Sequence, residues 1–320
     1  MAEIKRKRIL VTGGNAVAGD GLKSVVAAGE FSGREFVFPG SKELNLLDAA
    51  ATRKYVADWK PDAIVHFAAI SGGIQLTLDH PASVMRDNIL MNLNVVEAAR
   101  LSGVTKIIMT LSAAIYPMNA PVPMKEESLH EGYPHETNYS YAFAKRLIDP
   151  MAKAYHKEYG MDVVGIIPGA IIGPKSSFDP KSSTAIPAII RRFYENREGD
   201  GPLVVWGDGS PLRQFTSGDD IGRVAMWCVD NYNEPQMLNV STMEETSIKD
   251  AAYMIAEFLG IDAKRLTFDT SKPAGTPRQA IDNTKFMSLS HFTYMPARET
   301  IKRTVEYFAA NYPDPKKLRL

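Results

Sequence analysis

The sequence predicts an α/β protein, with a doubly wound parallel Rossmann sheet and a smaller mixed α/β C-terminal substrate lobe. Short apolar runs alternate with amphipathic helical patterns along the first half of the chain. A glycine-rich turn follows the first apolar run, and the third run, residues 62–69, is apolar almost throughout. Alternating strands and helices imply parallel strands, and a strand buried on both faces is expected to be continuously apolar.

The strands expected in the main sheet are short β-rich segments that lie between helical patterns. They are residues 8–12, 35–38, 62–69, 106–111 and 162–168. The helices expected beside them are residues 19–28, 81–101 and 138–159. The last helix should bend at Pro150, because proline has no amide hydrogen and its ring crowds the preceding turn. A helix at 219–230 and a strand at 237–240 are expected to return to this sheet.

A second lobe is expected where the composition changes after Gly173, with prolines at 174, 180 and 187. Its expected elements are a basic helix at 189–196, a strand at 203–206, and helices at 247–259 and 299–311. Ser247 and Asp250 resemble a capping box, which is typical of a helix N-terminus. The expected division is a dinucleotide-binding domain at residues 1–172 and 214–241, and a lobe at residues 173–213 and 242–320.

Composition argues against several kinds of partner. The 320-residue chain has 37 Lys and Arg and 37 Asp and Glu, so its net charge is zero, whereas binding to nucleic acid or anionic membranes usually leaves a basic excess. No apolar run approaches the roughly 18 residues that a membrane span needs. The one cysteine, Cys228, excludes an intrachain disulfide, and a reducing cytoplasm is the expected location. No group of acidic residues and histidines has metal-ligand spacing, so no metal is expected.

The first expected strand ends in a turn that is suited to phosphate groups. Glycines let backbone amides approach a pyrophosphate, and the following helix supplies partial positive charge at its N-terminus. The turn departs from the GxxGxxG pattern of extended dehydrogenases at Ala16, which replaces the central glycine. Its place directly after the first strand still favours a dinucleotide site. The residues expected to contact the dinucleotide are Gly13, Gly14, Asn15, Val17, Ala18 and Gly19.

The end of the second expected strand indicates which dinucleotide binds. NAD enzymes usually place Asp or Glu there, where the carboxylate accepts a hydrogen bond from the ribose 2′-hydroxyl and would repel a 2′-phosphate. Here no carboxylate occurs before Glu43, while Ser41 and Lys42 could donate to a 2′-phosphate. The sequence therefore predicts NADPH as the cofactor in preference to NADH.

Three residues form a coherent candidate for catalysis of reduction. Tyr141 and Lys145 are four residues apart on an expected helix, so they share one helical face. A nearby ammonium favours the phenolate, so Lys145 should lower the pKa of Tyr141. Ser112 follows the fourth expected strand, at the sheet edge where doubly wound folds bind their ligands. Together they could protonate a carbonyl oxygen as hydride reaches its carbon.

With these motifs in order, the sequence resembles the extended short-chain dehydrogenase/reductase superfamily, and most closely its GDP-L-fucose synthase family. That family epimerises and then reduces a GDP-linked 4-keto-6-deoxy sugar. The resemblance covers nearly the whole chain, and its most family-specific stretch is WGDGSPLRQF at residues 206–215. The other matching stretches are ELNLLD (43–48), AAISGG (68–73), IYP (115–117), YAFAKR (141–146), IP (186–187) with RR (191–192), and KPAGTPR (272–278).

The resemblance implies roles for individual residues. Ser112, Tyr141 and Lys145 would carry out the reduction, and Tyr141 and Lys145 would also contact the cofactor, together with Ala68 and Ala69. Arginine can pair bidentately with phosphate, and Arg192 and Arg213 match positions that bind the nucleotide-sugar diphosphate. The further substrate contacts implied are Ser71, Gly72, Ser112, Ala114, Thr184, Trp206 and Arg278. A homodimer is also implied, in which helices 81–101 and 138–159 pair with their symmetry mates.

The sequence departs from the family at the residues of the epimerase chemistry. The family has a cysteine two residues after the catalytic serine and a histidine just before the Ile-Pro pair, where this chain has Ala114 and Thr184. Epimerisation beside a ketone needs a base and an acid, and neither side chain exchanges protons readily near pH 7. We therefore expect an NADPH-dependent reductase of the C4 ketone of a nucleotide-linked, by resemblance GDP-linked, 4-keto-6-deoxy sugar, without epimerisation at C3 or C5.

The histidines offer one route by which epimerase chemistry could persist. His130 and His135 precede Tyr141 and could replace the lost groups, although solvated or packing roles are the simpler interpretation. His66 lies on the third expected strand and is expected to be a satisfied core residue.

Two alternative functions stay open. One is a nucleotide-sugar 4-epimerase with bound NAD, because residues 112–116 (SAAIY) also resemble that group, although the missing acidic residue after the second strand argues against it. The other is a non-catalytic dinucleotide-binding sensor. Ala16 and the lost epimerase residues fit a sensor, whereas the retained Ser112, Tyr141 and Lys145 do not.

Overall fold

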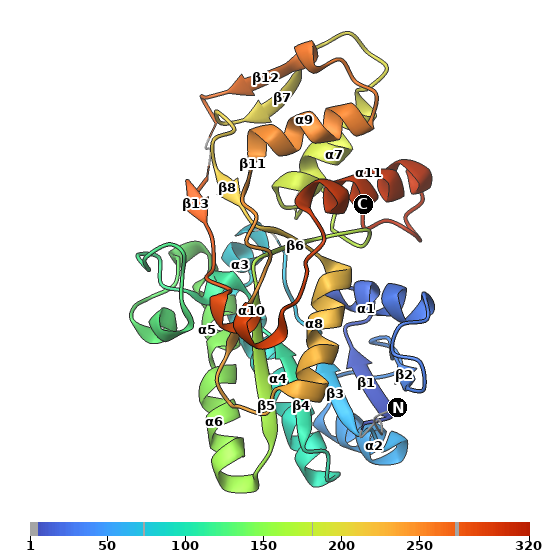
Figure 1. The fold of residues 1–320 in the computed structure, drawn as a ribbon, viewed down its shortest axis with the longest axis vertical. Helices are drawn as coiled ribbons and strands as arrows, with labels where there is room; N and C mark the ends of the chain where they lie inside the picture. Colours follow the sequence, from blue (N-terminus) through green and yellow to red (C-terminus); the bar gives the residue numbers. More distant parts are fainter. Residues whose placement is uncertain (1–5, 73, 181, 273–274) are drawn as a thin grey trace.

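Six parallel strands form the central sheet in the lower part of the molecule (Figure 1). The computed structural model describes residues 6–72, 74–180, 182–272 and 275–320. The strand order is β10-β5-β4-β3-β1-β2, and each pair is parallel. The order reverses between β1 and β3, which places the ligand crevice at the carboxyl ends of these strands. The strands are β1 (Arg8–Thr12), β2 (Glu35–Val37), β3 (Ala63–His66), β4 (Lys106–Thr110), β5 (Asp162–Pro168) and β10 (Leu238–Val240).

The predicted fold class is confirmed, and the differences lie at the ends of strands. The third strand ends at His66 rather than at residue 69, and β2 and β4 each end one residue earlier than expected. Backbone pairing continues briefly past these ends, since Phe67 N donates to Thr12 O at 3.1 Å and Leu111 N donates to Ile166 O at 2.8 Å. The chain then leaves the sheet to form the loops of the crevice.

Helices cover both faces of the sheet, and each face has its own apolar core. On one face lie α1 (Val17–Ala27) and α8 (Gly218–Asn231), whose core contains the buried Cys228. On the other face lie α2 (Ala49–Trp59), α4 (Pro81–Leu101) and α6 (Ile148–Tyr159). The sequence patterns missed α2, because only two of its side chains, Thr52 and Val56, are buried and its apolar stripe is weak.

Helices α1 and α8 cross in close contact because glycines stand at the crossing. A Cβ on Gly21 would lie 2.1 Å from the carbonyl carbon of Gly218, and a Cβ on Gly222 would lie 2.8 Å from Leu22 Cα. Any larger residue would therefore meet backbone atoms. This contact fixes α1, and with it the turn that precedes α1, against the sheet.

The long helix expected at 138–159 is two helices, α5 (Tyr139–Arg146) and α6, with a break at Leu147. The predicted bend at Pro150 is displaced by three residues. Proline lacks the amide hydrogen that would bond to the carbonyl four residues earlier, and its ring crowds that carbonyl. The carbonyl belongs to Arg146, so the break falls at the end of α5 and Pro150 lies in the first turn of α6.

The upper part of the molecule is a smaller mixed α/β lobe (Figure 1). Phe178, Phe193 and Phe308 lie at its core, and the chain enters and returns through the parallel pair of β6 and β9. Its helices and strands are β6 (Ala170–Ile172), α7 (Ala185–Glu195), β7 (Leu203–Trp206), β8 (Leu212–Arg213), β9 (Phe215–Ser217), β11 (Thr246–Ser247), α9 (Ile248–Phe258), β12 (Leu266–Asp269), β13 (Arg278–Gln279) and α11 (Ala297–Asn311).

Several expectations for this lobe are confirmed. Strand β7 matches the expected strand, and it pairs in parallel with β12. Ser247 Oγ accepts the amide of Asp250 at 2.9 Å, as the capping box predicts. Helix α7 begins at Ala185, four residues before the expected start, and α11 begins two residues early. The predicted domain boundaries stay a prediction, and Phe215 packs in the core of this lobe.

The remaining elements are short and lie on loops. They are α3 (Ile74–Asp79), α10 (Thr284–Ser290) and single 3-10 turns at Ala113–Ile115, Glu126–His130, Glu136–Asn138 and Ala263–Arg265. No helix in the described part of the chain has both the length and the apolar character to cross a membrane.

Candidate active site

The turn between β1 and α1 has the shape that a dinucleotide pyrophosphate requires. Gly13 has a φ of +73°, and a Cβ there would lie 2.5 Å from the amide nitrogen of Ala68. Ala16 replaces the expected central glycine without strain, because its φ of −91° and ψ of 170° suit any residue. No side chain among the described residues caps the N-terminus of α1, so no side chain competes with an anion for its first amides. The turn therefore fits a bound dinucleotide.

The loop after β3 lies against this turn and is held by a buried asparagine that the sequence patterns missed. Asn88, on α4, accepts the Ile70 amide at 3.1 Å and donates to the Ile70 carbonyl at 2.9 Å. The loop carries first the predicted cofactor contacts, Ala68 and Ala69, which are partly buried. The predicted substrate contacts, Ser71 and Gly72, follow and are exposed. Asn88 thus fixes the boundary between the predicted cofactor and substrate contacts.

The structure brings the three predicted catalytic residues together at the carboxyl end of β4. Ser112 begins the 3-10 turn Ala113–Ile115, and α5 packs against that turn. Tyr141 and Lys145 lie one turn apart on α5. Lys145 is buried, and its Nζ donates to the Thr110 carbonyl at 2.8 Å, two residues before Ser112. This hydrogen bond ties the helix to the strand end.

The electrostatics of the pair differ from the expectation. Burial raises the pKa of Tyr141 to about 12 and lowers the pKa of Lys145 to about 8. Both shifts favour the neutral form, because a low-dielectric surrounding disfavours charge. The predicted lowering of the Tyr141 pKa by Lys145 is therefore wrong for this structure, in which desolvation is the dominant influence on both groups.

Arg146, on α5, supports the serine turn, which is the 3-10 turn Ala113–Ile115 that follows Ser112. The sequence patterns do not indicate this role. Its Nε donates to the Ile115 carbonyl at 2.5 Å and its Nη1 donates to the Gly132 carbonyl at 2.7 Å. A second brace comes from Tyr116, whose hydroxyl donates to Asn239 Oδ1 at 2.7 Å on β10. Both braces join segments far apart in the sequence, so no local pattern signals them.

The positions that carry epimerase groups in the resembling family hold none here. Ala114 is the middle residue of the turn Ala113–Ile115, and its amide donates to Ser112 Oγ at 3.3 Å. Thr184 is exposed directly before α7. His130 binds Asp149 on α6 at 2.9 Å, and His135 binds Thr137 Oγ1 at 2.9 Å. Neither histidine lies on the serine turn or on α5.

His66 is the core residue that the sequence predicts. It is fully buried on β3, with Nδ1 2.7 Å from Thr12 Oγ1 and Nε2 3.1 Å from Asn92 Oδ1. Burial, with a smaller contribution from the charge of Lys145, lowers its pKa to about 3. His66 is therefore neutral, and both ring nitrogens have partners.

Two arginines in the upper lobe, Arg192 and Arg213, bond to backbone carbonyls and have no acidic partner within the described residues. Arg192 lies 5.7 Å from the centroid of the Trp206 ring and donates to the Val204 carbonyl, and Arg213 donates to the Thr276 carbonyl at 2.9 Å. Burial lowers the pKa of both guanidinium groups, and within the described residues neither pairs with a carboxylate. Trp206 is 58% exposed, so much of its side chain faces solvent beside Arg192.

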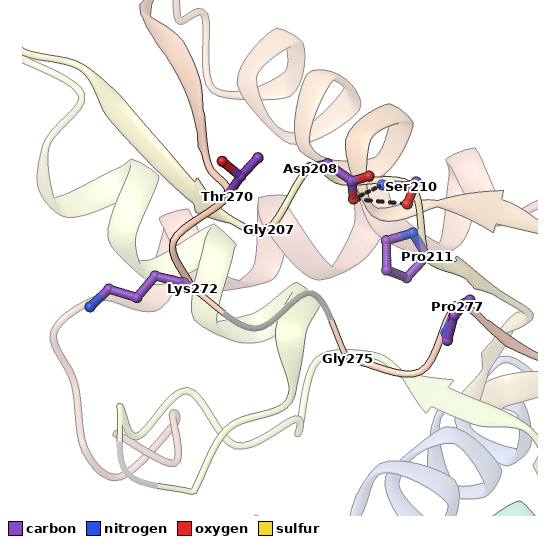
Figure 2. A pocket seen from close by; sticks show the side chains of 8 residues that line it. All are labelled: Gly207, Asp208, Ser210, Pro211, Thr270, Lys272, Gly275 and Pro277. Carbon is purple, nitrogen blue, oxygen red and sulfur yellow. Dashed lines mark hydrogen bonds between the residues drawn. The ribbon is translucent and has the colours of Figure 1, made fainter.

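A cleft of about 300 Å³ lies beside these residues, between the loops that follow β7 and β12 (Figure 2). Asp208 forms its rim, where its carboxylate accepts the Ser210 amide at 3.0 Å and the Ser210 hydroxyl at 2.8 Å. The predicted substrate residue Arg278 instead forms an ion pair with Glu245 at 2.6 Å. The cleft is lined by Gly207, Asp208, Ser210, Pro211, Thr270, Lys272, Gly275 and Pro277.

The loop after β2 presents the predicted ribose contacts. Ser41 and Lys42 are exposed, whereas the Glu43 carboxylate accepts the Gly40 amide at 2.9 Å within its own turn. The Glu43 carboxylate thus has a donor within its own turn, while Ser41 and Lys42 stay exposed. No cluster of three or more His, Cys, Asp or Glu side chains in the described ranges is arranged to hold a metal.

Comparison with known proteins defines the class to which this fold and site belong. Residues 9–241 match the NAD dependent epimerase/dehydratase family, and the chain belongs to that family of NAD(P)-dependent enzymes. This match spans the turn, the serine, and the Tyr-Lys pair.

Within that class, the similarity is to GDP-L-fucose synthases over the whole chain. A probable GDP-L-fucose synthase of Drosophila melanogaster is 33% identical and is aligned over 97% of this chain and all of its own length. The GDP-L-fucose synthase of Dictyostelium discoideum is 34% identical, over 99% of this chain and all of its own. The resemblance drawn from the motifs is confirmed.

A solved structure agrees with this relationship. A GDP-L-fucose synthetase from Naegleria fowleri superposes with a TM-score of 0.90 at 31% identity, covering 100% of this chain and 98% of its own. The same protein has also been solved with NADP bound, and that structure superposes with a TM-score of 0.89.

Proposed function

We propose that this protein is an NADPH-dependent reductase of the C4 ketone of a GDP-linked 4-keto-6-deoxy sugar, and that it does not epimerise C3 or C5. One observation carries the proposal. Ser112, Tyr141 and Lys145 lie together at the end of β4, while the two positions of the epimerase pair hold Ala114 and Thr184. The groups needed for reduction are present, and those needed to exchange carbon-bound protons are not.

NADPH is the cofactor, and it supplies the hydride when bound. The turn that contains Gly13 and Gly19 would hold its pyrophosphate, because a Cβ at either glycine would meet backbone atoms and only glycine allows the turn to be this tight. Ser41 and Lys42 would face its 2′-phosphate. Lys145 has two donors left after its bond to Thr110 O, and these would hold the hydroxyls of the nicotinamide ribose.

The reaction at the ketone follows from the protonation states of the site. Burial keeps the Tyr141 hydroxyl protonated, so it can give its proton to the C4 oxygen as the hydride reaches C4. The Ser112 hydroxyl donates a hydrogen bond to the same oxygen and polarises the carbonyl. After the product leaves, solvent returns a proton to the Tyr141 phenolate oxygen.

The upper lobe would bind the nucleotide part of the substrate. Arg192 and Arg213 have no acidic partner among the described residues, so both can bind the diphosphate. The exposed Trp206 ring, beside Arg192, would stack on the base. In the neighbouring cleft (Figure 2), backbone groups and the Asp208 carboxylate would recognise the polar edge of the base.

The proposal is tested by incubating the protein with GDP-4-keto-6-deoxymannose and NADPH. We expect one NADPH consumed per product, and a product in which only C4 has changed. Tyr141→Phe removes the proton donor, so kcat should fall by about 100- to 10,000-fold. Catalysis with no net NADPH consumption would instead indicate a 4-epimerase, and NADPH binding without turnover on any 4-keto sugar would indicate a sensor.

A further inference from the structure

Lys23, on α1, is a basic residue beside the phosphate turn that the sequence patterns did not single out. A Cβ on Gly14 would lie 2.9 Å from Lys23 Cε and 3.0 Å from Phe38 Cβ, so both side chains close against this glycine. Lys23 Nζ donates to Asn15 Oδ1 at 2.9 Å and lies 5.3 Å from the centroid of the Phe38 ring. The ammonium is therefore held between the turn after β1 and the end of β2.

This position corresponds to one corner of a dinucleotide site. In a doubly wound fold the pyrophosphate lies on the turn after the first strand, and the adenosine ribose lies at the end of the second. Phe38 directly follows β2, and the loop that carries Ser41 and Lys42 comes next. Lys23 thus reaches from α1 into the corner where a 2′-phosphate on that ribose would lie.

The charges around this corner favour an anion. The only acceptor that Lys23 has within the described residues is the neutral amide oxygen of Asn15, so two of its three donors stay available. Lys42 adds a second exposed ammonium, and the Glu43 carboxylate is engaged by the Gly40 amide. Asp20, in the first turn of α1, is an acidic residue whose carboxyl interacts with the Lys23 charge, but burial raises its pKa and so favours its neutral form. A phosphate would therefore meet two cations there, Lys23 and Lys42.

We propose that Lys23 donates to the 2′-phosphate of bound NADPH and, with Lys42, determines the preference for NADPH over NADH. Phosphate oxygens replace the Asn15 amide oxygen as acceptors, and a charged acceptor binds an ammonium more strongly than a neutral one. The proposal concerns the cofactor, so it does not depend on which sugar the protein reduces.

The test measures binding without any substrate. Isothermal titration gives the Kd of 2′,5′-ADP and of 5′-ADP, two fragments that differ only in the 2′-phosphate. For Lys23→Gln we expect the Kd of 2′,5′-ADP to rise by about 10- to 100-fold, and the Kd of 5′-ADP to change by less than about threefold. Lys42→Gln should act in the same direction. Lys54→Gln, at an exposed lysine on α2 paired with Asp58, is the matched control and should change neither Kd.

The variants also separate a direct contact from a structural role. Lys23→Arg keeps the charge and should retain most of the discrimination between the two fragments, and thermal melting checks that each variant is folded. A Lys23→Gln protein that loses affinity equally for both fragments would overturn the proposal, because Lys23 would then act on the shared part of the ligand. An unchanged Kd for both fragments would overturn it as well.

Discussion

At the scale of single residues, burial decides the protonation of the catalytic pair. Tyr141 and Lys145 lie one helical turn apart, yet the pKa of the phenol is raised to about 12 and that of the ammonium is lowered to about 8. A tyrosine that stays protonated is ready to give a proton, whereas a lysine with a pKa near 8 changes charge within the working range. The lysine is therefore the group whose titration should be visible.

This gives a prediction for pH dependence. Lys145 carries its charge below about pH 8 and loses it as the pH rises through that value. The charged ammonium would hold the hydroxyls of the nicotinamide ribose, so kcat/KM should fall above about pH 8 as this charge is lost. The measurement is a pH profile of kcat/KM, which reports groups of the free enzyme. Lys145→Arg should lose this limb because arginine does not titrate there, and a limb that persists in Lys145→Arg would contradict the assignment.

The sequence predicts that Ser112, Tyr141 and Lys145 lie together, which the structure bears out, but it does not predict how their surroundings act on them. The Ser-Tyr-Lys set follows from strand order and helical spacing, both of which are local. The pKa directions, the brace of Asn88 on the Ile70 loop and the contacts of Arg146 come from segments that meet only after folding. No pattern within one segment could indicate them.

At the scale of elements, the close crossing of α1 and α8 fixes the position of the glycine turn between β1 and α1. Gly21 and Gly218 let the two backbones touch, and Val17, the first residue of α1, lies at the same contact because a Cβ on Gly218 would be 2.4 Å from its carbonyl oxygen. The N-terminus of α1 is thus held in place directly beside the turn that would bind the pyrophosphate.

A methyl group at this crossing should therefore weaken both the fold and the cofactor site. Gly21→Ala would place its Cβ against the Gly218 backbone, and we expect a loss of about 1–3 kcal/mol in the free energy of unfolding. Chemical denaturation measures this loss, and titration should show weaker NADPH binding. Gly201→Ala is the control, since a Cβ there meets nothing within 4 Å. Equal stability of the two variants would contradict the packing described.

Elements with strong patterns were predictable, and those defined by tertiary contacts were not. The expected bounds of β1, β5 and α4 match the structure, because each has a clear apolar pattern and a distinct end. Helix α2 was missed because it buries little. The sequence predicts a bend at Pro150, whereas the helices break at Leu147, because the proline acts on the carbonyl four residues before it.

At the scale of the whole molecule, α4 and α6 leave apolar side chains in the solvent. Leu90, Leu93 and Leu101 on α4 are 38%, 43% and 46% exposed, and Tyr159 at the end of α6 is 45% exposed. A surface of this kind on neighbouring helices is typical of an interface. The homodimer implied by the family resemblance would cover it.

We therefore predict a homodimer through this face. Light scattering coupled to size exclusion should give twice the 35.3 kDa chain mass. Leu93→Glu should shift the protein to the monomer, because a charge would be buried in the interface. Leu289→Glu, on α10 and 50% exposed, is the matched control and should remain a dimer. A monomeric unmodified chain, or a dimeric Leu93→Glu variant, would contradict this.

The central claim is that the protein reduces C4 and leaves C3 and C5 untouched, because Ala114 and Thr184 cannot exchange carbon-bound protons. The most direct measurement is deuterium incorporation from deuterated water during turnover of GDP-4-keto-6-deoxymannose with NADPH. A GDP-L-fucose synthase serves as the positive control, and a reaction without enzyme gives the background. We predict a reduced product with no deuterium above background at C3 or C5. Enzyme-dependent deuterium at either carbon would contradict the account.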